Sequence, residues 1–197
     1  MAWQVPMTET ADVTVIVAHI PTRAWMLRQA LSSICLQTVQ PASIIVETDV
    51  HRRGAASTKN AALSRVTTEW TACLDDDDVM LPHHLETLLA AAESTGADVV
   101  YSWPQMEGGA DPRPDRFGVP FDADELRRGS YIPTTALIRT ELAQAVGGYQ
   151  CPPGSDYDDW GVYLRMLDEG AVFHHVAQRT WIWRVHRQNT SGRPDRW

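Results

Sequence analysis

Residues 70–82 read WTACLDDDDVMLP, an apolar run that leads directly into four consecutive aspartates. The run at 70–74 is short and continuously apolar, which is typical of a strand covered on both faces of a parallel sheet. In an open parallel sheet, ligands collect at the carboxyl ends of the strands. The aspartates at 75–78 therefore stand where such a fold places a binding site.

The segments around this strand alternate between strand and helix patterns. Strand patterns occupy residues 13–18, 43–48 and 98–103, and helical patterns occupy residues 25–37, 55–66 and 82–95. Strands that alternate with helices of this length favour a parallel sheet with right-handed crossovers. We therefore expect an α/β fold, a single Rossmann-like domain with a mostly parallel central sheet and helices on both faces.

The pattern changes after residue 103. Residues 104–120 are rich in Gly, Pro and charge, which predicts a long surface loop. Further on, the patterns predict strands at 134–140, 171–176 and 180–186, and helices at 141–149 and 157–170. Residues 187–197 show no periodicity and are expected to form a flexible tail. We see no internal repeat and no domain boundary, so residues 1–197 are expected to form one domain.

Composition limits the possible functions. A net charge of -8 argues against non-specific nucleic-acid binding, because phosphate contacts depend on clustered Lys and Arg. The three cysteines are widely spaced in apolar segments, so we expect buried, reduced thiols. The first residues lack the basic start and apolar run of a signal peptide. No apolar stretch reaches the roughly 20 residues that span a bilayer. We expect a cytoplasmic protein without a membrane segment.

The aspartate run is suited to metal binding. Carboxylates spaced i, i+2 beyond a strand end can direct two oxygens to one ion, and Mg²⁺ and Mn²⁺ are held by a few carboxylates plus substrate phosphates. The alternative is an acidic turn that only caps the helix beginning near Pro82. One or two aspartates would suffice for a cap, so metal binding is favoured.

Two stretches, residues 13–50 and 54–82, resemble the nucleotide-binding half of the GT-A glycosyltransferases. The resemblance is strongest to the large inverting family that uses nucleotide-diphosphate sugars, and it covers most of the chain. It implies a GT-A fold, a Mn²⁺ or Mg²⁺ cofactor and a nucleotide-sugar donor, with a UDP-sugar favoured.

The same resemblance assigns roles within the first half. In the D-x-D motif of the family, Asp75 would lie on the ribose side with Asp76 beside it, and Asp77 would bind the metal. Asp49, after the second strand, would meet the base. Lys59 would be the basic residue at the start of the following helix.

The second half resembles the family as well. Residues 147–170 are similar to the segment in which an acidic pair opens a helix and its second member acts as the catalytic base. This implies Asp159 as the base and Asp158 as a contact to the nucleotide sugar. The alternative is that the pair, together with Asp156 and Ser155, only caps the helix.

The remaining candidates are weaker. His186 matches the late histidine that approaches the metal in many such enzymes, although a surface histidine explains it as well. Arg184 would neutralise the diphosphate, unless it belongs to a solvated edge. Trp103 would stack on a sugar ring, with core packing as its alternative.

Other aromatic residues near these candidates are assigned differently. We expect Trp181 and Trp183 to belong to the core. An alternating strand turns only one of His174 and His175 inward, which leaves their contribution to the site open.

Together these features predict a metal-dependent inverting glycosyltransferase. Residues 12–103 would bind the nucleotide sugar, and residues 104–186 would bind the acceptor and supply the base. The acceptor remains open among a small molecule, a glycan, a protein and, as a minority hypothesis, a hydroxylated base in DNA.

Two alternatives compete with this function. One is a catalytically inactive GT-A module that binds nucleotide sugars. The other is a sugar nucleotidyltransferase, which is disfavoured because residues 18–26 lack the glycine-rich phosphate loop expected there.

Overall fold

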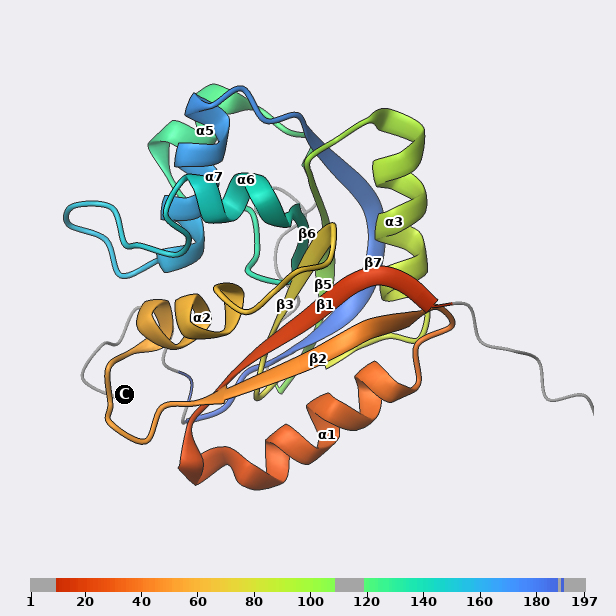
Figure 1. Cartoon of the computed structure of the whole chain (residues 1–197), viewed down its shortest axis with the longest axis vertical. Helices are drawn as coiled ribbons and strands as arrows, with labels where there is room; N and C mark the ends of the chain where they lie inside the picture. The colour runs from red at the N-terminus through yellow and green to blue at the C-terminus, as the bar shows by residue number, and fades with distance from the viewer. Residues whose placement is uncertain (1–9, 109–118, 188, 190–197) are drawn as a thin grey trace, which may run out of the picture.

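In the described part of the chain, seven strands form one sheet in the order β2-β1-β3-β6-β5-β7-β4 (Figure 1). The computed structural model describes residues 10–108, 119–187 and 189. The strands are β1 (Thr10–His19), β2 (Gln40–Thr48), β3 (Trp70–Asp75), β4 (Val79–Met80), β5 (Val99–Glu107), β6 (Ala136–Arg139) and β7 (Phe173–Arg184). The helices are η1 (Pro21–Arg23), α1 (Ala24–Cys35), α2 (Ala55–Leu63), α3 (His84–Thr95), α5 (Ala123–Arg128), α6 (Thr140–Ala145) and α7 (Asp158–Asp168).

Most strands of the sheet run in one direction. β1 is parallel to β2 and β3, and β5 is parallel to β7. β6 lies antiparallel between β3 and β5, so these two neighbours point the same way. The two-residue β4 pairs antiparallel with β7. The predicted mostly parallel sheet is therefore confirmed.

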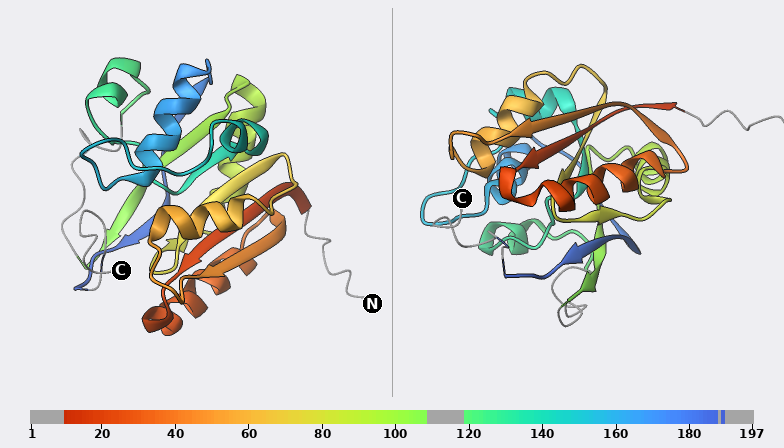
Figure 2. Two further views of the ribbon diagram at one scale, coloured as in Figure 1. Left: turned by 60° about the vertical axis from the view of Figure 1, so that its left-hand side comes forward. Right: turned by 90° about the horizontal axis from the view of Figure 1, so that it is seen from below.

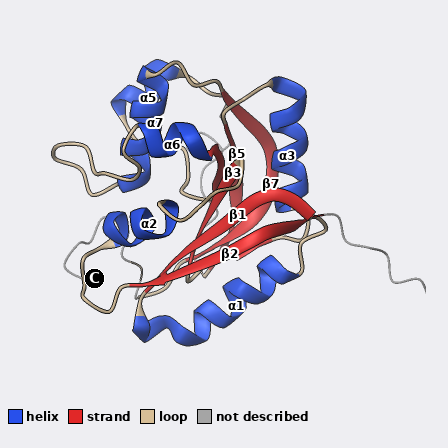
Figure 3. Ribbon diagram, in the orientation of Figure 1, coloured by secondary structure: helices blue, strands red, loops and turns tan. Residues whose placement is uncertain are grey.

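Helices cover both faces of the sheet, as predicted (Figures 1 and 3). Successive side chains of a strand point to opposite faces, and β1 shows the effect: Val15 and Val17 pack with α1 and α3, whereas Ile16 packs with α2 and α7. In the left panel of Figure 2, α2 and α7 lie in front of the strands. Among the described residues, no helix has the length and apolar character needed to cross a membrane.

Several local predictions were wrong. Residues 104–107 continue β5 instead of entering a loop, because they pair with β7 up to Arg184. The two predicted late strands are one strand, β7, which stays paired with β5 across two register shifts near Trp103. Residues 109–118 of the predicted loop, and all of the predicted tail except 187 and 189, lie outside the described residues. Cys73 is a buried thiol, but Cys35 and Cys151 are exposed.

Candidate active site

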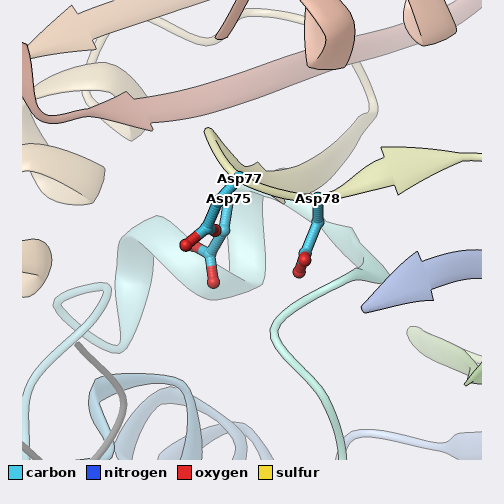
Figure 4. Close-up of side chains that lie close together, drawn as sticks. All are labelled: Asp75, Asp77 and Asp78. Carbon is cyan, nitrogen blue, oxygen red and sulfur yellow. The ribbon is translucent and has the colours of Figure 1, made fainter. Parts of the chain in front are cut away.

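The aspartate run forms the turn between β3 and β4. β3 ends at Asp75, and the amide of Asp78 donates to the Asp75 carbonyl over 3.1 Å, which closes the turn. One carboxylate oxygen from each of Asp75, Asp77 and Asp78 lies within 4.8 Å of the others. Figure 4 shows the three side chains leaving the turn toward the same side. The acidic turn thus presents three oxygens around one small space.

Burial makes this group of negative charges costly. It raises the pKa of Asp75, Asp77 and Asp78, and repulsion from neighbouring aspartates adds to the rise. Lys59 partly offsets the rise at Asp75, and Arg23 does so at Asp77. A divalent cation would remove the repulsion and is bound by such oxygens, so the three carboxylates fit Mn²⁺ or Mg²⁺.

Asp76 differs from its neighbours because it bonds to protein groups through both oxygens. Its Oδ2 lies 2.8 Å from His19 Nδ1 and accepts the Ile20 amide over 2.8 Å, while its Oδ1 accepts Arg23 Nη1 over 3.1 Å. The side chain is 1% exposed. Asp76 thus holds the turn against the end of β1, and its predicted contact to the nucleotide sugar stays a prediction.

Pairing of β4 with β7 brings the end of β7 next to the acidic turn. His186 Nε2 lies 3.1 Å from Asp77 Oδ2. Asn189 Nδ2 lies 3.4 Å from the same oxygen, and Asn189 Oδ1 accepts the His186 amide over 2.6 Å. The structure thus brings His186 beside Asp77, and its predicted role at the metal stays a prediction. Asn189 was missed because it falls in a segment without periodicity.

The second acidic pair opens α7 on the opposite wall. Lys59, from α2, donates to Asp158 Oδ1 over 3.0 Å and to Thr134 Oγ1 over 3.1 Å, and its Nζ lies 3.9 Å from Asp75 Oδ1. Burial alone would lower the pKa of the Lys59 ammonium, but attraction to Asp158 and Asp75 outweighs burial and raises that pKa. Lys59 therefore links the acidic turn to α7.

Asp159 has the electrostatics of a carboxyl group that titrates near neutrality. Burial, with a contribution from Asp158, raises the pKa of Asp159 to about 7, although Lys59 opposes the rise. One of its oxygens accepts the amide of Trp160 over 2.8 Å. A carboxyl group with a pKa near 7 can exchange a proton near neutral pH.

One cleft joins the two acidic groups. Its lining includes the aspartates at 75–78, Arg23, Lys59, residues 156–159, Trp181, Trp183 and Asn189. Trp181 is buried in the core, as predicted, whereas Trp183 is partly exposed, and both line the cleft. They occupy positions i and i+2 of β7, which share one face of the strand.

Three residues predicted to contact the nucleotide sugar do not line the cleft: Asp49, Arg184 and Trp103. The oxygens of Asp49 accept the amides of Arg53 and Gly54, each over 2.8 Å, and so order the loop before α2. The guanidinium of Arg184 contacts Glu107 and Gln29, so only the amide of Arg184 reaches the acidic turn, where it donates to Asp78.

The remaining aromatic candidates also lie elsewhere. The Arg179 guanidinium lies over the Trp103 ring, 4.9 Å from its centroid. His175 packs against Tyr101, with ring centroids 5.0 Å apart. Neither His174 nor His175 lines the cleft.

A family model built from the sequences of known proteins identifies the family of this chain. The model described as "Glycosyl transferase family 2" matches residues 27–147, which is more than half of the chain. The chain belongs to glycosyl transferase family 2. This agrees with the resemblance to the glycosyltransferases seen in the sequence. No curated protein matches the sequence.

Solved structures show the same GT-A glycosyltransferase fold. TarS 1–349 from S. aureus in complex with UDP-GlcNAc superposes with a TM-score of 0.73 at 14% identity, covering 90% of this chain and 59% of that one. The mannosyltransferase PcManGT from Pyrobaculum calidifontis, in complex with GDP-Man and Mn²⁺, gives a TM-score of 0.66 at 18% identity, covering 92% and 59%. The chain thus spans about 59% of the length of these structures.

Proposed function

We propose that this glycosyltransferase uses Mn²⁺ or Mg²⁺ to transfer a sugar, with inversion, from a nucleotide-diphosphate donor to an acceptor hydroxyl. The observation that carries the proposal is the shared cleft. The acidic turn comes from the first half of the chain and Asp159 from the second, yet both face the same space. A donor bound between them would have its diphosphate near the turn and its sugar near a base.

The metal would be held by Asp75, Asp77 and Asp78, with His186 beside Asp77. When bound, such an ion supplies a Lewis acid that stabilises negative charge on the departing diphosphate. The Mn²⁺ in the PcManGT complex supports this assignment. The three carboxylates would balance the charge of the ion, and Arg23 and Lys59 lie beside Asp77 and Asp75, respectively, as fixed positive charges.

Asp159 would act as the general base. Its carboxylate accepts the proton of the acceptor hydroxyl as the acceptor oxygen bonds to the anomeric carbon and the bond to the diphosphate oxygen breaks. Attack from the face opposite the leaving group inverts the anomeric centre, and the electron pair of the broken bond leaves with the diphosphate. Lys59 donates to Asp158 over 3.0 Å beside the base and limits the rise in the pKa of Asp159.

A UDP-sugar is the donor that we propose, because TarS has been solved in complex with UDP-GlcNAc and with UDP. GDP-Man in PcManGT makes GDP-sugars the first comparison. Residues 12–103 would bind the donor, and residues 104–186 would supply the acceptor side. The acceptor hydroxyl would belong to a small molecule, a glycan, a protein or, as a minority hypothesis, a modified base in DNA.

A panel of UDP-, GDP- and dTDP-sugars tests the proposal, with and without Mn²⁺. We expect one sugar nucleotide to raise the melting temperature only with Mn²⁺ and to be hydrolysed slowly. The Asp77→Ala variant should lose both effects. Stabilisation without hydrolysis or transfer would instead indicate an inactive nucleotide-sugar-binding module. If no sugar nucleotide stabilises the protein, the proposal is wrong.

A further inference from the structure

Arg23 is a buried cation placed directly on the proposed metal site. It ends η1, the short turn that follows β1, and is 4% exposed. Its Nη1 lies 2.7 Å from Asp77 Oδ2 and 3.1 Å from Asp76 Oδ1. The same side chain lines the cleft. A guanidinium is always charged in proteins, so Asp77 already has a positive partner before any ion arrives.

Arg23 and a divalent cation would therefore compete for Asp77. An ion held by the acidic turn would lie within a few ångströms of the guanidinium, in a region that burial shields from water. Like charges repel strongly at that distance and in that environment. The fixed charge of Arg23 thus weakens the attraction of the empty turn for an ion.

Arg23 also pairs with Asp76, and this ion pair can remain when the guanidinium moves away from Asp77. One Asp76 oxygen is taken by His19 and the Ile20 amide, whereas the other accepts from Arg23. A small rotation of the guanidinium would therefore break one ion pair without leaving the charge buried and unpaired. This second partner lowers the cost of the exchange.

We propose that Arg23 makes cation binding dependent on the donor, an inference that rests on the proposed function. In the donor-free protein, Arg23 satisfies Asp77 and ion binding is weak. The diphosphate of an arriving donor brings negative charge that attracts both the ion and the guanidinium, so the two cations no longer compete. Donor and ion then strengthen each other's binding, and by linkage the effect is reciprocal.

Mn²⁺ binding, measured from the electron paramagnetic resonance signal of the free ion, tests the inference without an activity assay. Each protein is titrated alone, with UDP and with GDP. Arg23→Gln removes the charge but keeps a hydrogen-bond donor, Arg23→Lys keeps the charge, and Arg28→Gln removes an exposed arginine of α1 as the matched control. Circular dichroism confirms that each variant is folded.

We expect Arg23→Gln to bind Mn²⁺ alone about ten-fold tighter than the wild type and to gain less from the nucleotide, a coupling of the usual size. Arg23→Lys and Arg28→Gln should behave like the wild type. Unchanged or weaker Mn²⁺ binding by folded Arg23→Gln would overturn the inference. The inference would also be overturned if the wild-type protein bound Mn²⁺ equally well alone, with UDP and with GDP. Failure of the wild type to bind Mn²⁺ under any condition would overturn the proposed function itself.

Discussion

The pKa of Asp159 sets the expected pH dependence of transfer. Burial raises this pKa to about 7, so the carboxyl is protonated below neutrality and cannot accept a proton. We expect kcat/KM for transfer to rise as pH increases through about 7 and to level off above it. A rate that is constant between about pH 5 and pH 9 would contradict the assignment of Asp159 as the base.

Replacement of the same side chain separates binding from chemistry. Asp159→Asn keeps the shape and an oxygen that can accept the Trp160 amide, but it cannot accept the proton, so transfer should fall by about 10²–10⁴-fold. Donor binding, measured by calorimetry, should remain. Asp168→Asn, at the exposed end of the same helix, is the control and should retain activity. Equal loss of donor binding in Asp159→Asn would mean that Asp159 is structural.

The acidic turn predicts that the effect of Mn²⁺ on stability increases with pH. The folded-state pKa values of Asp75, Asp77 and Asp78 are raised, so these groups stabilise the ion-free protein at low pH, and that contribution is lost as pH rises through those values. An ion must displace the same protons, so it binds better when they are gone. Melting curves at about pH 6 and pH 8, with and without Mn²⁺, measure the effect. An equal Mn²⁺ shift at both pH values would contradict this account.

At the scale of the element, α7 depends on one glycine for its position. A Cβ added to Gly161 would overlap the carbonyl oxygen of Gln150 and approach Pro152. Gly161→Ala must therefore push away the helix that carries Asp158 and Asp159. We expect a loss of about 1–3 kcal/mol in the free energy of unfolding, measured with urea, and a loss of transfer.

Gly129→Ala is the matched control for this substitution. Gly129 has extended backbone and no atom within 4 Å of the added Cβ, so its replacement should be neutral. Equal effects of the two substitutions would show that packing of α7 on Gln150 is not the cause.

The sequence predicted the elements whose burial is encoded locally. β1, β3 and β5 contain apolar runs that are buried, which is how strands covered on both faces appear, whereas β2 was predicted from a short apolar run although it lies at the sheet edge without a buried residue. The antiparallel insertion of β6 between β3 and β5 was not predicted, because strand order depends on pairing between distant segments. β4 has two residues and exists only through its pairing with β7, so no local pattern marks it.

At the scale of the whole molecule, the same limit explains the site residues that were missed. The position of the aspartates followed from the rule that ligands bind at strand ends, and Asp159 and His186 from the resemblance to a family. Arg23 contacts Asp76, which lies 53 residues away in the sequence. Asn189 contacts Asp77, which lies 112 residues away. Neither residue lies in a motif, so only the folded chain reveals its contact.

Lys59 connects the two halves of the molecule, and its removal should affect both stability and the base. Lys59→Met leaves Asp158 buried without its cation, which should cost about 3–5 kcal/mol in the free energy of unfolding. Because Lys59 lowers the pKa of Asp159, the same variant should move the midpoint of the pH–rate profile upward. Lys59→Arg retains the charge and should keep the wild-type midpoint.

The double variant Lys59→Met with Asp158→Asn distinguishes the ion pair from simple loss of packing. It removes both charges, so it should recover part of the stability lost in Lys59→Met, and urea unfolding of the four proteins measures the coupling. If the two substitutions are additive and the pH midpoint of Lys59→Met is unchanged, the link between the halves is packing alone. Recovery of stability together with an upward midpoint would show that one buried ion pair both joins the halves and tunes the base.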